Sequence, residues 1–568
     1  MSNLLSQASL VMIPSGYKED VVYSQIPTSG AGDLSFTRAS NGTRINSAGL
    51  VEVVAWNLLT YSEEFDNAGW NKDLGATVTA NTTTAPNGTT TADTLTIANG
   101  QYLYQYVTLN AGQSYTISVY VRVASGTKQF KFNTYGSGND FTSSTYTATT
   151  EWQRFEYTFT TVGSGSTGIY PVLVDGLPSA TFFIWGAQLN IGSTAKPYFP
   201  TTDRLNVPRL TYQNGGGGCP SLLLEKQSTN LNIYSEDYTN ATWDKLDIVT
   251  TNYSNVVISP DGTQNASKLI PNTTSSSYHG LQLSSGRPSL TGGVVYTYSL
   301  FAKAQGYTKI RLQNFSQAVR AQFDLSNGTL INQSGTTTTF IDSMGNGWYR
   351  IGFTYTQSST QSSYWNILVV STDDNSSTAP VAFSGNGTDA IAIYGAQLEA
   401  STYATSYIPT TSASATRVAD ECSKTGITSL IGQTEGVLFV DFVFTAFDGS
   451  AKWIAFLGGG ANYIGLYANS NTYIIGEVSN TTSQFSGAYS FSVGQRYKIA
   501  IAYKANDFAY YVNGSQITTS SSGTVPTTSD FTFLYSTTND RIGGKVYNQM
   551  ALFKTRLTNA ELASLTTI

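Results

Sequence analysis

Charged side chains are scarce in this sequence of 568 residues, where Asp, Glu, Lys and Arg together make up only 12%. The usual share is about 25%. Acids outnumber bases by 36 to 30, and Lys and Arg form no basic run. Because phosphate binding needs clustered basic side chains, we expect no nucleic-acid partner. The apolar content of 40% is enough to build hydrophobic cores, so the low charge does not predict disorder.

Long apolar runs are missing, and cysteine and histidine are rare. No apolar run approaches the ~18 residues of a membrane span, so we expect no membrane insertion. The opening "MSNLLSQASLVMIPSGYKED" has neither a basic start nor a long apolar core, which excludes a standard signal peptide. Cys219 and Cys422 fit no metal-binding spacing. We predict two free thiols, with a disulfide between module junctions as the alternative.

The one histidine, His279, limits catalytic chemistry. A Ser-His-Asp triad or a histidine–metal site could occur only once in this chain. We place His279 in a loop without a neighbouring nucleophile and predict no role for it.

Aromatic and small polar residues are abundant instead, with 37 Tyr and 27 Phe among many Ser, Thr, Asn and Gly. This composition favours short strands and polar turns over helices. The length allows roughly three or four domains. We therefore predict an ordered, nearly all-β protein with several cores.

A sixteen-residue phrase occurs twice, as "NLLTYSEEFDNAGWNK" at 57–72 and as "NLNIYSEDYTNATWDK" at 230–245. The match continues through "YTISVYVRV" and "YTYSLFAKA", whose alternation predicts strands with one buried face. Pro-Asn-Gly and Pro-Asp-Gly predict turns at matching places. We predict two homologous β modules, at about 57–203 and 230–415, each a β-sandwich or jelly roll.

Further features flank the two modules. The lead-ins match one another, with Arg38 corresponding to Arg209, and predict a short strap before each module, lying within the chain or along a neighbouring subunit. From about 422 the pattern changes to strands such as "EGVLFVDFVF" and "RYKIAIAYKANDFAYYVNG". The closing "LTNAELASLTTI" predicts a short helix, with Thr558 and Glu561 as a capping box. We predict a third sandwich here.

These stretches resemble known families. "NLLTYSEEFDNAGWNK", "APNGTTTADTL" and "WGAQLN" resemble carbohydrate-binding-module-like jelly rolls of bacteriophage fibre and appendage proteins. "EGVLFVDF", "RIGG" and "ALFKTRLTNAELASL" resemble the concanavalin A-like, laminin-G-like lectin fold. The resemblance implies an all-β chain of tandem jelly-roll β-sandwiches followed by a concanavalin A-like sandwich. The expected domains are an N-terminal virion-attachment segment at 1–35, jelly roll 1 with its strap at 36–208, jelly roll 2 with its strap at 209–418, and the lectin-like domain at 419–568.

The resemblance also implies a function. It suggests a non-enzymatic phage virion appendage, a head or tail fibre or spike on the virion surface, that adheres to host-surface glycans. The implied partners are other virion proteins, bound through the N-terminal segment, and bacterial surface polysaccharide, with a homotrimer expected by analogy. One alternative is a purely architectural capsid or collar decoration protein without sugar binding. Another is the binding portion of a glycan-degrading enzyme, which the absent signal peptide disfavours.

Cofactors and catalytic carboxylates are not expected. Related jelly rolls often hold a structural calcium through an Asp pair in the last strand, but Ala-Gln pairs stand at 187–188 and 396–397, so calcium is unsupported. Related glycosidases place two carboxylates about 5–10 Å apart. Glu435 and Asp441 on one predicted strand would be about 20 Å apart, which excludes such a pair.

Ligand-binding residues are expected among side chains that differ between the two copies, because loops carry function while strands carry packing. The shared Trp70 and Trp243 are interpreted as core residues, although an exposed Trp could stack on a sugar ring. In the third domain we expect tyrosines and an acid along one face or its rim. The candidate ligand-binding residues are Tyr135, Asp140, Tyr278, Tyr364, Trp365, Tyr463, Tyr467, Tyr473 and Asp507.

Overall fold

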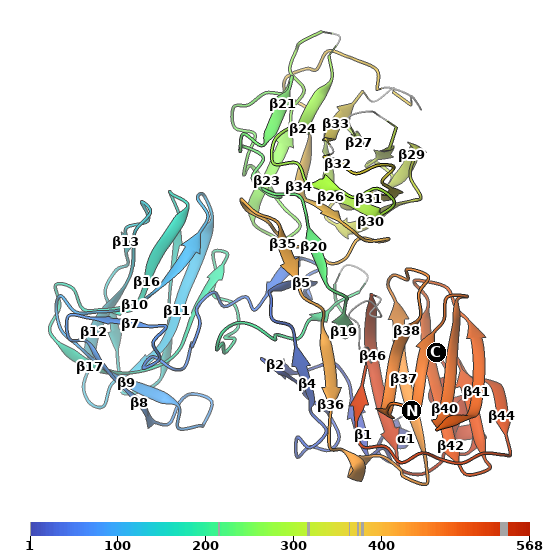
Figure 1. Ribbon diagram of the computed structural model, residues 1–568. Helices are drawn as coiled ribbons and strands as arrows, with labels where there is room; N and C mark the ends of the chain where they lie inside the picture. Colours follow the sequence, from blue (N-terminus) through green and yellow to red (C-terminus); the bar gives the residue numbers. More distant parts are fainter. Residues whose placement is uncertain are drawn as a thin grey trace. The chain divides into compact units, whose positions relative to one another are not determined.

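The computed structural model describes residues 2–213, 216–275, 277–314, 318–362, 364–371, 374–375, 380–533 and 544–568. The chain is about 50% strand and 2% helix, which confirms the all-β prediction (Figure 1). It divides into two compact units, which comprise Met1–Glu52 with Asn206–Asp261 and Ala266–Ile568, and Val53–Leu205 with Gly262–Asn265. Across the described ranges, no helix is long and apolar enough to cross a membrane.

The first module is a sandwich of two antiparallel sheets. One sheet has the order β13-β12-β16-β10-β7, with β14 also on β12, and the other has the order β15-β11-β17-β9-β8. Apolar side chains from both sheets, such as Leu103 and Ile117, form one buried core. The strands are β7 (Asn71–Asp73), β8 (Thr77–Thr83), β9 (Ala92–Ile97), β10 (Tyr102–Leu109), β11 (Ser114–Arg122), β12 (Lys128–Tyr135), β13 (Phe141–Thr142), β14 (Tyr146–Ala148), β15 (Gln153–Thr160), β16 (Gly165–Leu173) and β17 (Ala180–Ile191).

The second module repeats this plan, with sheets β21-β24-β33-β27-β28-β29 and β22-β23-β34-β26-β31-β30. Two further pairs, β20 with β35 and β25 with β32, complete it. The strands are β20 (Ser228–Asn230), β21 (Trp243–Leu246), β22 (Val257–Ile258), β23 (Gln264–Leu269), β24 (His279–Leu283), β25 (Ser289–Leu290), β26 (Val295–Gln305), β27 (Lys309–Asn314), β28 (Arg320–Asp324), β29 (Thr329–Ser334), β30 (Thr338–Gly345), β31 (Trp348–Thr356), β32 (Gln361–Ser362), β33 (Trp365–Val370), β34 (Ala390–Glu399) and β35 (Ala415–Arg417).

The repeated phrase closes the base of each module. Trp70 and Trp243 are buried, as predicted, at 1% and 0% exposure. Their indole nitrogens donate to equivalent main-chain carbonyls, that of Tyr61 at 2.9 Å and that of Tyr234 at 3.1 Å. The sixteen-residue repeat is therefore explained by equivalent packing in the two modules.

The C-terminal sandwich also has two sheets. One has the order β18-β19-β46-β37-β42-β43-β44, with β1 also on β46, and the other has the order β2-β3-β4-β36-β45-β38-β39-β40-β41. The elements are α1 (Ser2–Leu5), β1 (Leu10–Met12), β2 (Tyr17–Lys18), β3 (Val21–Val22), β4 (Leu34–Thr37), β18 (Leu210–Thr211), β19 (Ser221–Leu224), β36 (Glu421–Lys424), η1 (Thr428–Leu430), β37 (Glu435–Phe444), β38 (Lys452–Gly459), β39 (Asn462–Ala468), β40 (Tyr473–Asn480), β41 (Thr482–Ser490), β42 (Arg496–Lys504), β43 (Phe508–Val512), β44 (Ser515–Ser520), β45 (Phe531–Thr532), β46 (Lys545–Phe553) and α2 (Asn559–Thr566).

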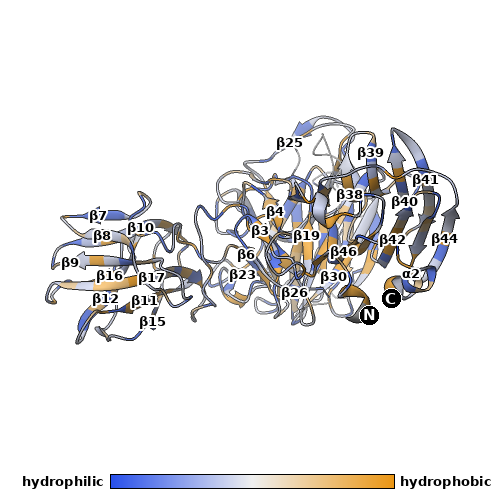
Figure 2. Ribbon diagram, turned by 90° about the horizontal axis from the view of Figure 1, so that it is seen from below, coloured by the Kyte–Doolittle hydropathy of each residue, from blue (hydrophilic) through white to orange (hydrophobic). Residues whose placement is uncertain are grey.

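The sequence suggested that residues 1–35 form a separate segment, but the structure includes them in the C-terminal sandwich. β1 pairs with β46, so that Leu10 lies opposite Leu552, and β4 pairs with β36. Leu10 and Leu34 are fully buried in the core of the C-terminal sandwich. β19 joins β46 from the second lead-in, and hydrophobic, orange ribbon lies around its label in Figure 2. Strands from three distant parts of the chain thus build one domain.

The two lead-ins meet at one buried carboxylate. Arg38 donates to Asp420 at 2.9 Å, and Arg209 donates to the other oxygen of Asp420 and to Glu225, the latter at 2.7 Å. Although burial would raise the pKa of Glu225, the charges of Arg417 and Arg209 lower it to about 2. The matching arginines of the straps therefore meet within the chain and share one acid. β5 (Gly42–Ile45) and β6 (Val51–Val54) belong to the first lead-in.

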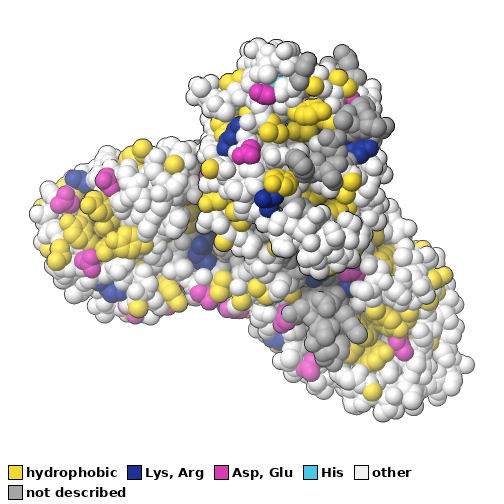
Figure 3. Space-filling view, turned by 45° about the horizontal axis from the view of Figure 1, so that its top comes forward, with side chains coloured by type: hydrophobic (Ala, Val, Ile, Leu, Met, Phe, Trp, Pro, Cys, Tyr) yellow, Lys and Arg dark blue, Asp and Glu magenta, His cyan; other side chains and the backbone are white. Residues whose placement is uncertain are grey.

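The local signals at the C-terminus are confirmed. The Thr558 hydroxyl accepts from the Glu561 amide, and the Glu561 carboxylate accepts from the Thr558 amide at 2.8 Å, which completes the capping box of α2. The surface in Figure 3 is dominated by uncharged atoms with isolated charged groups, in keeping with the low charge of the sequence.

Candidate functional site

Five tyrosines share the outward face of one sheet in the first module. Along β10, Leu103 points into the core while the tyrosines on either side point outward, because side chains alternate along a strand. β12 ends on another tyrosine, and β16 carries the fifth. We call this set the tyrosine face; it consists of Tyr102, Tyr104, Tyr106, Tyr135 and Tyr170.

The tyrosine face has a packed centre and two open rings. Tyr104 and Tyr170 stack with ring centroids 4.8 Å apart, and Tyr106 meets Tyr104 edge-on at 5.2 Å. Tyr104 and Tyr170 are 9% and 8% exposed, whereas Tyr106 and Tyr135 are 55% and 61% exposed. The centre therefore holds a fixed position while two rings remain available to a ligand.

Gly168 forms the floor between the two open rings. In the sheet register, Tyr106 on β10 and Tyr135 on β12 both lie opposite Gly168 on β16. With strands about 4.8 Å apart, the backbones of the two open tyrosines are about 10 Å apart. A Cβ at Gly168 would lie 3.1 Å from the Tyr170 ring and 3.5 Å from the Tyr104 ring. The Tyr170 and Tyr104 rings therefore lie against this glycine, and a larger residue here would push them aside.

The hydroxyls of the two stacked tyrosines stay protonated. Tyr104 donates to Asp73 at 2.8 Å, and burial, together with this hydrogen bond, raises the pKa of Tyr104 above its ordinary value. Burial, with the nearby Tyr106, raises the pKa of Tyr170 to about 12. At neutral pH the centre of the face therefore carries neutral hydroxyls.

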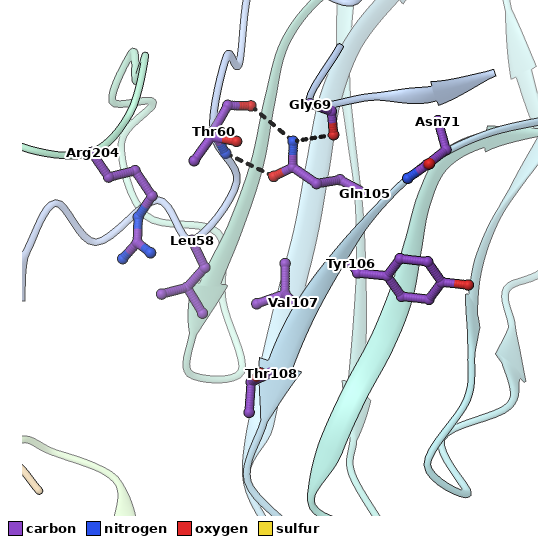
Figure 4. Close-up of a pocket in the computed structure, with 9 residues that line it drawn as sticks. All are labelled: Leu58, Thr60, Gly69, Asn71, Gln105, Tyr106, Val107, Thr108 and Arg204. Atoms are coloured by element: carbon purple, nitrogen blue, oxygen red, sulfur yellow. Dashed lines mark hydrogen bonds between the residues drawn. The ribbon is translucent and has the colours of Figure 1, made fainter. Parts of the chain in front are cut away.

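A cleft of about 560 Å³ lies beside Tyr106, along the edge of β10 beyond the short strand β7 (Figure 4). Gln105 fixes one wall, since its amide donates to the carbonyls of Thr60 and Gly69, each at 3.2 Å, and accepts from the Thr60 amide. Figure 4 shows the Tyr106 ring directed away from Arg204. The cleft is lined by Leu58, Thr60, Gly69, Asn71, Gln105, Tyr106, Val107, Thr108 and Arg204.

Sequence reasoning found one residue of this face and missed four. Tyr135 lies on it, whereas Asp140 accepts from the Gly136 amide at 2.8 Å and so holds the turn after β12. Contact of either residue with a ligand stays a prediction. The missed signal is the alternation "YLYQY" at 102–106, which has no aromatic counterpart in "GLQLS" of the second copy.

The corresponding face of the second module is different. Gln282 and Asn366 occupy the positions of Tyr104 and Tyr170, and the Gln282 amide donates to Asn366 at 2.9 Å. Gln322 on the same sheet is fully buried and donates to the carbonyl of Asp374 at 2.7 Å. In the described part of this face, amide groups are engaged with one another and with a loop.

The candidates of the second module are scattered. Trp365 is fully buried in the core, stacked on Tyr298 at 4.9 Å, so its selection as a ligand-binding residue is wrong. Tyr278 is 43% exposed. The guanidinium of Arg287 lies 3.7 Å from the centroid of the Tyr364 ring. The three predicted residues, Tyr278, Tyr364 and Trp365, therefore do not form a common site.

The prediction that His279 lies in a loop is wrong. It is the first residue of β24, and it is fully buried. Its ring nitrogens lie 2.6 Å and 2.9 Å from the carbonyls of Asp247 and Phe383. It therefore stabilises the fold. Cys219 is exposed, Cys422 is buried, and both are free thiols as predicted.

In the C-terminal sandwich, the tyrosine predictions converge in part. Tyr463 and Tyr467 on β39 both donate to Glu477 on the neighbouring β40, at 2.9 Å and 3.1 Å. Tyr473 begins β40 and is 43% exposed. One sheet face therefore gathers two predicted tyrosines around a carboxylate that the sequence analysis did not select.

The other acids of this domain are engaged in ion pairs. Asp507 precedes β43 on the other sheet and pairs with Arg556 at 2.9 Å, so it does not belong to the tyrosine group. Glu435 and Asp441 lie on the single strand β37, as predicted, and Asp441 accepts from Arg496 at 2.8 Å. These carboxylates do not face one another across a common site.

Two lysine ammonium groups lie where a cation could otherwise bind. The Lys72 ammonium nitrogen lies within 3.2 Å of four main-chain carbonyl oxygens, and that of Lys245 lies within 3.0 Å of three. Calcium favours such oxygen ligands. Over the residues that the structure describes, no group of three or more His, Cys, Asp or Glu side chains could hold a metal ion.

One part of the chain matches a family of known proteins. Residues 57–173 match a family described as "Carbohydrate binding domain". The whole tyrosine face lies within that match. No curated protein matches this chain.

Several solved structures match parts of this chain at low identity. The tandem CBM22-1-CBM22-2 domain of Paenibacillus barcinonensis Xyn10C has 14% identity and a TM-score of 0.20, over 61% of this chain and 98% of that one. Trypanosoma rangeli sialidase has 14% identity and a TM-score of 0.21, over 26% of this chain, which spans 27% of the sialidase. The receptor-binding domain of botulinum neurotoxin C/D mosaic serotype has 11% identity and a TM-score of 0.23, over 26% and 40% of the two chains.

Proposed function

We propose that the first module binds a glycan on the tyrosine face. The observation that carries this proposal is the pair of exposed rings, Tyr106 and Tyr135, on either side of Gly168 and of the stacked tyrosines that cover it. Aromatic rings pack against the C–H face of a sugar, while neutral hydroxyls exchange hydrogen bonds with it. The family match at 57–173 supports the same conclusion. The role is binding, not catalysis.

We further propose that the protein is a phage virion appendage, displayed as a homotrimer on the virion surface and anchored to other virion proteins through its N-terminal part. The support is the resemblance of its jelly-roll modules to those of phage fibre and appendage proteins. Each site would bind bacterial surface polysaccharide weakly, and several copies would supply avidity. Locating the protein on purified particles by labelling tests this placement.

An architectural role is favoured for the second module. Its corresponding face carries Gln282 and Asn366 in place of the stacked Tyr104 and Tyr170, and Gln322 on the same sheet is fully buried. Amides that are already hydrogen-bonded within the module offer little to a sugar. This module would therefore space or connect the other two.

The test is retention of the full chain on a panel of bacterial surface polysaccharides. We expect saturable retention, and we expect Tyr106→Ala and Tyr135→Ala each to weaken it roughly 2- to 10-fold, the effect of losing one aromatic contact. Tyr278→Ala, which removes an exposed tyrosine of the second module, is the matched control. Retention that survives both substitutions unchanged would contradict the proposal.

A further inference from the structure

A second aromatic cluster lies on the outward face of the C-terminal sandwich. β38, β39 and β40 are neighbours in one sheet, and Ile464 and Leu466 of β39 point into the core. Tyr463, Gly465 and Tyr467, which alternate with these two residues along the strand, therefore point outward. We call this set the Glu477 cluster; it consists of Trp453, Phe456, Tyr463, Tyr467 and Glu477.

The rings of the Glu477 cluster are packed around one tryptophan. The Trp453 ring lies 5.0 Å from Tyr467, 5.6 Å from Tyr463 and 4.8 Å from the buried Phe456 beneath it. A Cβ at Gly465 would come within 2.8 Å of the Trp453 ring, so the ring lies across this glycine. Trp453, Tyr463 and Tyr467 remain half-buried, so part of each ring reaches the surface.

The polar groups of the Glu477 cluster can accept further hydrogen bonds from a ligand, but their own protons are already donated within the cluster. Both tyrosine hydroxyls donate to the same oxygen of Glu477, Oε2. Burial, and then the neighbouring Glu477, raises the pKa of Tyr467 to about 12, so its proton stays on the hydroxyl. With both protons committed, the polar groups of the cluster offer lone pairs on the two tyrosine oxygens and on the carboxylate.

We propose that the Glu477 cluster is a second carbohydrate site, specific for uncharged sugars. An uncharged sugar can place its C–H face on Trp453 and donate its hydroxyls to the lone pairs around Glu477. An acidic sugar would bring its carboxylate toward Glu477, and none of the five residues of the cluster carries a positive charge to offset the repulsion. The site is independent of the tyrosine face.

The test uses the full chain in which the tyrosine face is already disabled by Tyr106→Ala and Tyr135→Ala. Affinity electrophoresis through dextran and arabinogalactan, which are neutral, and through alginate, which is acidic, measures retention. We expect a neutral polysaccharide to retain this chain and alginate not to retain it. Tyr467→Phe keeps the ring but removes one lone-pair site, and Glu477→Gln neutralises the carboxylate, so each should weaken retention on the neutral gel 3-fold or more.

Tyr511→Phe is the matched control, because it also removes a tyrosine hydroxyl that donates to a side chain, Gln516 at 2.7 Å, but on the other sheet. It should leave retention unchanged. The proposal is overturned if the disabled chain binds neither neutral polysaccharide, if alginate retains it equally well, or if Tyr467→Phe and Glu477→Gln have no effect. Each of these outcomes leaves the tyrosine-face proposal standing, since that proposal is tested in the unmodified chain.

Discussion

At the scale of single residues, the repeated Tyr-Ser-Glu core forms a polar latch in the second module. Glu236 accepts from the hydroxyls of Tyr394 at 2.8 Å and Tyr407 at 3.0 Å. The Tyr394 hydroxyl also lies 3.1 Å from Asp261, although it has only one proton to give. Burial, and then the charge of Asp261, raises the pKa of Glu236 to about 7. The latch therefore favours a protonated Glu236.

This gives a pH dependence with a definite sign. The folded state keeps the proton on Glu236 up to about pH 7, while the unfolded state releases it near its ordinary pKa of 4.5. The contribution of this group to the free energy of unfolding is therefore lost as the pH rises from about 4.5 to 7. Glu236→Gln should flatten this part of the pH profile of the thermal unfolding midpoint. Glu151→Gln, at an exposed site, should leave the profile unchanged, and a wild-type profile that rises across the window would contradict the account.

The residue scale also shows where sequence reasoning reaches its limit. The burial of Trp70 could be predicted, because a position shared by two copies is explained by their common fold. Trp365 could not be placed by the same rule, since it differs between the copies yet faces the core of its own module. Glu477 gave no signal, because it becomes part of a site only through two tyrosines on the neighbouring strand.

At the scale of elements, most long strands could be predicted and the short pairings could not. The alternation in "YTISVYVRV" predicted the strand β11, and that in "YTYSLFAKA" predicted β26. β1 has three residues, and its partner β46 lies more than 500 positions away, so no local pattern marks the pair. Residues 1–35 looked separate for that reason.

Deleting residues 1–30 should destabilise the C-terminal sandwich. The deletion removes Leu10, Met12 and Val22 from its core, each worth about 1.5–3 kcal/mol of burial. It also exposes an edge of β46 that β1 covers, and such edges promote aggregation. We expect a lower unfolding midpoint for this domain. Hydrogen exchange of peptides from 545–553 measures its unfolding. Deletion of 2–5 alone is the milder comparison, and equal midpoints for the long deletion and the full chain would contradict this interpretation.

At the scale of the whole molecule, three β-sandwiches carry three different surfaces. The two jelly rolls share their closing phrase and their core plan, yet one presents open tyrosines and the other engaged amides. The C-terminal sandwich presents a tryptophan beside an acid. The fold class could be predicted because packing repeats along the sequence, whereas the faces depend on side chains brought together across strands.

The central claim, that sugar binds on the tyrosine face of the first module, is tested most directly by hydrogen–deuterium exchange of the full chain with and without the polysaccharide that retains it. The account predicts slower exchange in peptides covering β10, β12 and β16, and no change in β24, β27 and β33, their counterparts in the second module. Protection confined to the second module, or none in the first module at saturating polysaccharide, would contradict it.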